Sequence, residues 1–180
     1  MIMRRVDNMD IKPRYEHTAF GNFMFKLCAK TAKFLLKHRW LYYLLACTWG
    51  IIMTFLGLLI SGVLGVASLF TKKIKFEKYH WIYRIKVGPD YWGGLEMGLM
   101  FLRDHKSDDR YINCHEFGHT IQNCILGPLF PFIVGIPSAA RYWIQEFRRR
   151  KGKSNPPYDG FWAEDAATQC GQYFIDNLSK

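Results

Sequence analysis

The sequence lacks any C-x-x-C pair, and its five cysteines are an odd number spread over 180 residues. A framework of paired disulfide bonds and a cysteine-based metal site are therefore both excluded as organising features. Acidic residues are also scarce: 15 Asp and Glu stand against 25 Lys and Arg, which leaves a formal net charge of +10. No apolar run follows the first charges closely, so we expect no signal peptide at the start of this sequence.

A basic chain favours either nucleic acid or an anionic membrane surface as its partner. The apolar residues decide between the two, because they are concentrated in long stretches. Residues 41–70 are thirty residues without a charged side chain, and residues 121–140 form a second uncharged stretch. We therefore expect the lipid bilayer as a partner and no nucleic acid.

Residues 1–40 are expected to form a basic N-terminal region. Residues 1–20 have mixed charge and are interrupted by Pro13, which predicts a loosely ordered tail. Between Phe23 and Trp40, lysines recur at three- and four-residue spacing opposite an apolar side, which predicts an amphipathic helix in the headgroup layer. The alternative is a solvated lead-in to the next helix. The lysines are Lys26, Lys30, Lys33 and Lys37.

The uncharged stretch at residues 41–70 predicts one transmembrane helix, because a span needs about twenty apolar residues. Its excess length implies tilt or an interfacial extension. Aromatic residues at its start are expected at the membrane interface, namely Trp40, Tyr42 and Tyr43. Small residues four apart would let another helix approach closely, so self-association through this helix could use Gly57, Ser61 and Gly65.

Short strands are expected after residue 70. Residues 72–87 alternate between apolar and charged side chains, and the alternation slips near Tyr79 and His80, which predicts two short strands or a bulge. Residues 93–102 are expected to form a further strand. It is either an ordinary glycine-containing strand or an edge strand that could hold an extended peptide beside the site described next.

The sequence His115-Glu116-Phe117-Gly118-His119 matches the pattern H-E-x-x-H. Residues four apart lie on one face of a helix, so the two histidines can offer two nitrogens to one Zn²⁺ ion. Glu116 could then take the proton of a zinc-activated water as general base. A helix is predicted over residues 109–126, because Ser107-Asp108-Asp109 can begin it and Gly127-Pro128 can end it.

The second apolar stretch, residues 121–140, contains three prolines and follows the motif directly. A full crossing would place any downstream ligand about 30 Å from the histidines. We therefore expect this stretch to be re-entrant or interfacial, unless the metal itself sits at membrane depth. The basic run Arg148 to Lys151 then returns the chain to water or to acidic headgroups.

A third protein ligand is required for catalytic zinc. Glu164 is the preferred candidate, because it lies one turn into a helix predicted near residues 158–178, and Asp159 is the alternative. Asp165 would point about 100° away from Glu164 around the same helix. A side chain that stabilises the oxyanion is also expected, and the candidates are Tyr158, Tyr173 and His105.

The motif followed about 45 residues later by Phe161-Trp162-Ala163-Glu164-Asp165-Ala166-Ala167 resembles the gluzincin metallopeptidases, most closely the membrane-bound CAAX prenyl protease and HtpX type. The resemblance implies E-x-x-A-D on the later helix, with the glutamate as third zinc ligand. Here Glu164 and Ala167 match, and Thr168 replaces the supporting aspartate. The segment from His115 to Gln122, followed by Leu126-Gly127-Pro128-Leu129, also resembles small uncharacterised bacterial membrane proteins with the same motif. The resemblance as a whole covers roughly Tyr91 to Tyr173. Residues 155–160 have a weaker likeness to the N-P-x-x-D-G segment of site-2-type intramembrane proteases, which would make Asp159 the ligand.

Together these observations predict an α+β fold. It combines a basic region at 1–40, a transmembrane helix at 41–70 and a zincin-like catalytic domain at 71–180 with a short sheet, the H-E-x-x-H helix and a later ligand helix. The expected function is a membrane-anchored zinc metallopeptidase that cleaves peptides or membrane proteins. The alternative is a catalytically inactive zinc-binding membrane protein that acts through partner binding. We expect a bacterial cell membrane location with the site facing the cytoplasm, because basic residues are more numerous after Phe70.

Overall fold

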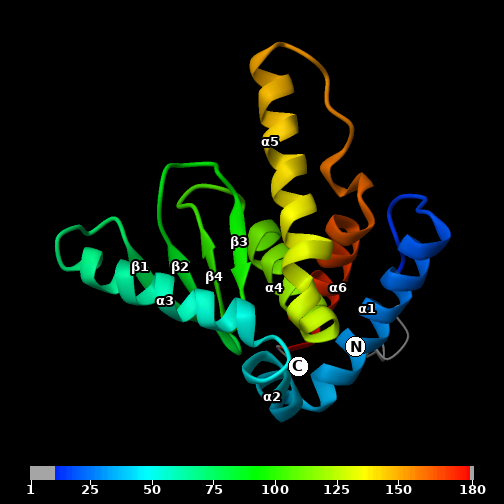
Figure 1. Ribbon diagram of the computed structural model, residues 1–180, viewed down its shortest axis with the longest axis horizontal. Helices are drawn as coiled ribbons and strands as arrows, with labels where there is room; N and C mark the ends of the chain where they lie inside the picture. Colours follow the sequence, from blue (N-terminus) through cyan, green and yellow to red (C-terminus); the bar gives the residue numbers. More distant parts are fainter. Residues whose placement is uncertain (1–10, 179–180) are drawn as a thin grey trace, which may run out of the picture.

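The computed structural model describes residues 11–178 and has a mixed α+β architecture (Figure 1). The predicted α+β class is therefore confirmed. Within the described residues there are six α-helices and one four-stranded sheet, with short irregular turns between them. In chain order the elements are α1 (Ala19–Lys37), α2 (Arg39–Cys47), α3 (Ile51–Ser68), β1 (Lys75–Tyr79), β2 (Ile82–Lys86), β3 (Gly94–Met97), β4 (Met100–Arg103), α4 (Asp109–Leu126), α5 (Ile136–Arg150) and α6 (Trp162–Leu178).

The sheet has the strand order β1-β2-β4-β3, so β3 is an edge strand. β1 and β2 form an antiparallel hairpin that turns at His80, where the predicted strand pattern slips. The single strand predicted over residues 93–102 is wrong. It is a second hairpin, because Gly98 adopts a φ of 73° between β3 and β4 and reverses the chain there. β2 and β4 then pair in parallel.

The core lies where α1, α4 and α6 pack together beside the sheet (Figure 1). α1 buries five side chains against its neighbours, while Lys26, Lys30 and Lys37 stay exposed. Of the apolar side expected to meet lipid, Leu35 is covered by protein, whereas Phe23 and Phe34 are exposed. The position of this helix in the headgroup layer therefore stays a prediction. The buried side chains are Met24, Phe25, Cys28, Ala32 and Leu35.

The described part of the N-terminal tail is held in place by hydrogen bonds. The backbone N–H groups of Arg14 and Tyr15 both donate to the Asp165 carboxylate, at 2.8 and 3.3 Å. His17 Nε2 lies 2.9 Å from the same oxygen. The expectation of a loose tail is therefore wrong for residues 11–20, and residues 1–10 lie outside the described residues.

The predicted single helix over residues 41–70 is two helices, with a break at residues 48–50. Tyr42, expected at a membrane interface, is instead buried and stacks on Phe117. α3 is long and apolar enough to cross a membrane, but only 17% of it is buried. Gly57 and Ser61 face the sheet and not a second helix, since Gly57 abuts the Met97 carbonyl.

The second apolar stretch does not form a straight helix. α4 ends at Leu126, where Gly127 takes a φ of 53°. The segments Arg110–Leu129 and Pro131–Arg150 are bent by 116° relative to each other. The re-entrant or interfacial placement of residues 121–140 stays a prediction. Such a placement requires a sharp bend in the chain, and the bend is present.

Candidate metal centre

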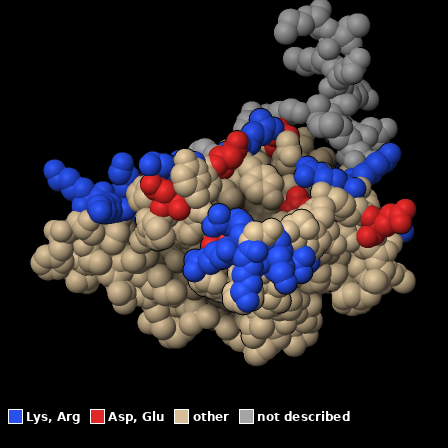
Figure 2. Space-filling view, turned by 90° about the horizontal axis from the view of Figure 1, so that it is seen from above, with Lys and Arg blue, Asp and Glu red and all other residues tan. Residues whose placement is uncertain are grey.

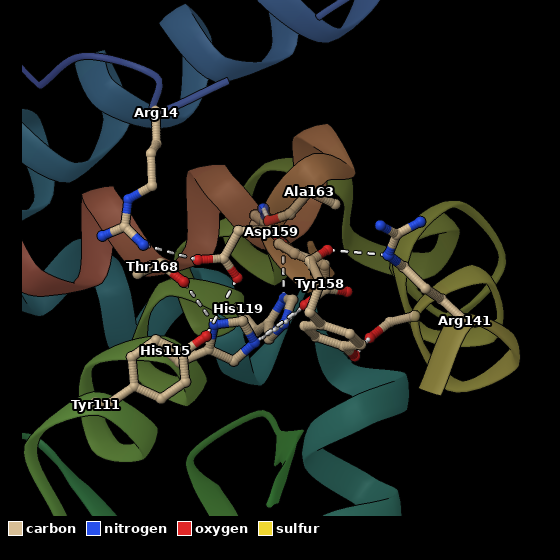
Figure 3. A network of polar contacts seen from close by, with 12 residues as sticks. Arg14, Tyr111, His115, His119, Arg141, Tyr158, Asp159, Ala163 and Thr168 are labelled. Atoms are coloured by element: carbon tan, nitrogen blue, oxygen red, sulfur yellow. Dashed lines mark hydrogen bonds and ion pairs between the residues drawn. The ribbon is translucent and has the colours of Figure 1, made fainter. Parts of the chain in front are cut away.

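Three ligand-type side chains from two helices converge at one point. His115 and His119 come from α4, and Glu164 comes from α6. His115 Nε2 lies 3.0 Å from Glu164 Oε2, His119 Nε2 lies 3.4 Å from the same oxygen, and the two Nε2 atoms are 3.1 Å apart. All three side chains are buried. Figure 3 shows the two imidazoles side by side below the start of α6.

These distances fit a tetrahedral metal ion. Zinc bonds of about 2.0–2.1 Å at tetrahedral angles separate neighbouring ligand atoms by roughly 3.3 Å. The two oxygens of Glu164 are buried, and among the described residues their partners are the two imidazoles alone, so a cation bound between the three side chains would satisfy them. The set of two imidazoles and one carboxylate is the donor set of a catalytic zinc site. We conclude that His115, His119 and Glu164, called the metal group below, could hold a metal ion.

Each imidazole is oriented by a hydrogen bond at its other nitrogen. His119 Nδ1 lies 2.8 Å from Gln122 Oε1, and the amide nitrogen of Gln122 donates to the Ala163 carbonyl at 2.7 Å. The Gln122 oxygen can only accept, so Nδ1 carries the proton and the Nε2 lone pair points into the group. His115 Nδ1 lies 2.8 Å from the Thr168 hydroxyl, which can accept its proton in the same way.

The Thr168 contact bears on the missing aspartate of the E-x-x-A-D pattern. A hydroxyl oxygen stands where the resemblance implies a carboxylate, and it reaches the nitrogen of His115 that does not face Glu164. Orientation of the imidazole is therefore retained. The negative charge that would raise ligand basicity is lost.

The ionisation of the group follows from its burial and its internal contacts. Burial alone would raise the pKa of Glu164, but contacts with His115 and His119 lower it below its ordinary value. Burial alone would lower the pKa of His119, but the contact with Glu164 raises it from 6.5 to about 9. Without a metal, the carboxylate therefore attracts a proton to His119. A divalent cation would compete with that proton for the same nitrogen.

Glu116 lies against the edge strand of the sheet. Its side chain is buried, and a Cβ atom on Gly94 of β3 would overlap the carboxylate. Only glycine at position 94 leaves this space free. Burial raises the pKa of Glu116, and the nearby His115 and His119 oppose that shift. A carboxylate with a raised pKa can accept and hold a proton more readily than an ordinary one, as proton transfer requires.

Small residues allow the two ligand helices to approach closely. A Cβ atom on Gly118 of α4 would collide with the Ala167 carbonyl of α6, and one on Gly171 would collide with the Cys114 carbonyl. Both obstacles are backbone atoms, which cannot rotate away. The close approach brings Glu164 within reach of both histidines.

Asp159, the alternative ligand, does not belong to the metal group. It accepts from the Tyr111 hydroxyl at 3.2 Å and pairs with Arg14 at 3.4 Å (Figure 3). The Tyr111 ring stacks on His115 with centroids 5.7 Å apart. Asp159 therefore supports the site through Tyr111.

Of the three candidates for oxyanion stabilisation, the structure brings only Tyr158 to the site. Its ring centroid is 6.3 Å from that of His115. Tyr173 is nine residues after Glu164, on the opposite face of α6, and lies under Lys33. His105 is on the loop before α4 and bonds the Lys73 carbonyl.

The sequence analysis assigned no role to several residues that support the site. Gln122 and Tyr111 lie three and four residues from the two histidines on α4, so helical spacing was a usable signal. For Arg141 the sequence contained no such signal, because its guanidinium reaches a loop that is distant in the chain. It donates through Nε to the Tyr158 carbonyl at 2.9 Å and holds that loop against α5 (Figure 3).

Comparison with protein-family models, curated proteins and solved structures finds no match for this chain. The case for the site therefore depends on its own geometry and on the residue types that compose it. A buried group of two histidines and one glutamate, with each histidine oriented from behind, defines a candidate metal centre of the mononuclear kind.

Proposed function

We propose that the chain is a membrane-associated zinc metallopeptidase with His115, His119 and Glu164 as the zinc ligands. The observation that carries the proposal is the convergence of these three buried side chains from α4 and α6. Similarity of the H-E-F-G-H and E-x-x-A segments to gluzincins supports the same assignment. Zinc held there would supply a Lewis acid and a bound water with its pKa lowered to about 7.

Glu116 is the general base of the proposed reaction. It follows His115 directly on α4, and its buried carboxylate lies against Gly94 of β3. It takes a proton from the attacking water and then delivers it to the leaving amine. The burial that raises its pKa helps the protonated form to persist for the second transfer.

Tyr158 is the proposed stabiliser of the oxyanion. Burial raises the pKa of its phenol well above the neutral range, so the hydroxyl keeps its proton and can donate it. Its hydroxyl lies 3.0 Å from Ser138 Oγ, which fixes its direction from α5. A neutral donor at this position would favour the charged oxygen of the transition state over the substrate carbonyl.

The edge strand β3 is the proposed binding element for an extended peptide. It pairs with β4 on one side only, and Gly94 lies against Glu116. A peptide added to the other side would pass directly beside the general base. Main-chain pairing would bind many sequences, which is consistent with a peptidase and leaves selectivity to side-chain contacts.

The test combines metal content and cleavage in one preparation of the full chain. Wild type and Glu116→Gln are purified in detergent, loaded with zinc and incubated with a mixed peptide library read by mass spectrometry. Both proteins should retain zinc, and Glu116→Gln should cleave about 10²–10⁴-fold more slowly. Zinc binding without cleavage by wild type would favour the inactive partner-binding alternative. A wild type that binds no zinc would refute both.

A further inference from the structure

The helix α5 is turned with its polar side inward. Ser138 Oγ lies 3.0 Å from the Tyr158 hydroxyl, and Gln145 donates to the Pro156 carbonyl at 3.0 Å. Arg141 and Arg148 also bond backbone carbonyls of residues 154–158. The opposite side is apolar and largely exposed, with side chains more than half accessible: Ile136, Trp143, Ile144 and Phe147. A surface helix in water has the reverse orientation.

The helix α3 has an apolar outer side of the same kind. Its inner side packs along β3 and β4, where Gly57 abuts Met97 and Ser61 Oγ reaches Met100 Sδ at 2.6 Å. Ile60 and Leu64 continue this contact toward the helix end. The outer side contains no charged or polar side chain that is exposed between residues 51 and 60, and its large exposed residues include Ile51, Phe55, Leu58, Leu59, Val63 and Val66.

These two outer sides belong to one face of the molecule. In Figure 1, α3 passes in front of the sheet and α5 in front of α4, so both lie on the near side. Figure 2 views the molecule from above, so this near side is its lower edge. That edge shows no lysine, arginine, aspartate or glutamate, whereas charged side chains gather above it and at its centre. The outer sides of α3 and α5 therefore lie toward an edge of the molecule that shows no charged side chain in this view, and charged side chains lie next to that edge.

α3 cannot cross a bilayer while keeping its contacts with the sheet. Its packing on β3 and β4 extends from Gly57 to Leu64, the middle of the helix. A crossing orientation would draw β3, an edge strand, into the hydrocarbon. It would also bring in the lysines and arginines of β1 and β2. Charged side chains are costly at that depth.

Basic residues at the border of the face indicate the lipid that it contacts. Lys72 and Lys73 follow α3 directly and are exposed. Arg149 and Arg150 are the last residues of α5, and Lys151 follows them. All three are exposed, and both arginines pair with Glu146. Ammonium and guanidinium groups beside an apolar surface suit anionic headgroups above acyl chains.

We propose that the outer sides of α3 and α5 enter a single leaflet of an anionic bilayer, with α3 parallel to the membrane surface. The protein is then held from one side and does not span the membrane. This inference is independent of the metal chemistry, because it uses only the faces that point away from the metal group.

The test determines the sides on which the two ends of α3 lie. Cys47 is the exposed cysteine of the chain and precedes α3, and Lys73→Cys in a Cys47→Ser background reports on its other end. Each full-length protein is expressed and treated with a membrane-impermeant maleimide in sealed right-side-out and in inverted membrane vesicles. Labelling of both positions in the same vesicle type is expected. Labelling in opposite vesicle types would overturn the proposal.

A second measurement asks what covers the apolar face. A fluorophore at Leu59→Cys or Ile144→Cys, both in the Cys47→Ser background, should be quenched by nitroxide lipids in vesicles of phosphatidylcholine and phosphatidylglycerol. The matched control is Lys26→Cys, an exposed position on α1 outside the face, which should not be quenched. Disulfide-linked dimers through Leu59→Cys without lipid quenching would assign the face to a second copy and refute the proposal.

Discussion

The metal group and the outer face of α3 and α5 invert the usual distribution of residues in opposite ways. Between α4 and α6, histidines and a glutamate are buried, whereas on α3 and α5 tryptophan, phenylalanine and isoleucine are exposed. Soluble proteins normally expose charged and polar residues and bury large apolar ones. Each inversion is stable when a partner from outside the chain supplies what is missing. The partner proposed for the first is a cation, and for the second a layer of lipid.

The largest expected effect is the loss of the metal on removing its carboxylate. Glu164→Ala should reduce bound zinc from about one ion per chain to background, because two imidazoles alone do not complete the site. Peptide cleavage should be lost with it. Metal content after dialysis is the measurement. Asp176→Ala, an acidic residue of the same helix paired with Arg110, is the matched control and should retain zinc. If Glu164→Ala retained zinc, the third ligand would have to be a residue other than Glu164.

The same glycine substitution should have opposite effects in the two regions. Gly171→Ala should lower the free energy of unfolding by about 1–3 kcal/mol, because the new methyl group meets the Cys114 carbonyl. In Gly62→Ala on α3, the new methyl group would have no other atom within 4 Å. This substitution should raise the free energy of unfolding by about 0.5–1 kcal/mol, because alanine is more stable than glycine in a helix. Denaturant unfolding in detergent measures both. If the two substitutions changed the free energy of unfolding equally, α4 and α6 would not be in close backbone contact at Gly171.

Thr168→Val should weaken the metal site without dismantling it. The hydroxyl that orients His115 is removed while the volume is kept, which should reduce zinc affinity about 10–100-fold. Competition with a zinc chelator gives the affinity. Thr168→Asp restores an acceptor and is the control that should bind zinc at least as tightly as wild type. An unchanged affinity in Thr168→Val would show that the hydroxyl has no orienting role.

The smallest effect is a pH dependence of the metal-free protein. Burial opposes protonation of His119, but Glu164 outweighs it and raises the pKa from 6.5 to about 9. A raised pKa in the folded state stabilises the fold fully below pH 6.5, and this contribution is lost as the pH rises through about 9. Thermal unfolding of chelator-treated protein should therefore occur at a lower temperature above pH 9. In Glu164→Gln that dependence should be much reduced, and a wild type without it would contradict the assignment.

Local sequence signals were sufficient to predict where the helix that contains H-E-x-x-H begins and ends. Asp108 accepts from Tyr111 N at 2.7 Å as the N-cap, and α4 ends at Leu126 before Gly127, where both boundaries were predicted. Glu164 could be chosen for a related reason: its helix begins within a few residues of the predicted start. These features depend on residues close together in the chain.

Features set by tertiary contacts could not be predicted in the same way. Amphipathicity gives α1 an apolar side but does not say whether lipid or α6 covers it. The break between α2 and α3 is fixed by Trp49, whose indole donates to the Ile125 carbonyl at 3.2 Å and lies against Gly127. Nothing within residues 41–70 indicates that contact. The hairpin at Gly98 was missed because one glycine in a short apolar run is compatible with a strand or a turn.

The collisions that glycine avoids between α4 and α6 have a consequence for recognising distant relatives. H-E-x-x-H alone occurs by chance, but a motif helix that must lie against a ligand helix needs a small residue immediately before its second histidine, as Gly118 provides. The later helix needs a small residue seven positions after its glutamate, as Gly171 provides. A search that requires both small residues would discard many chance matches and retain chains able to bring the two helices together.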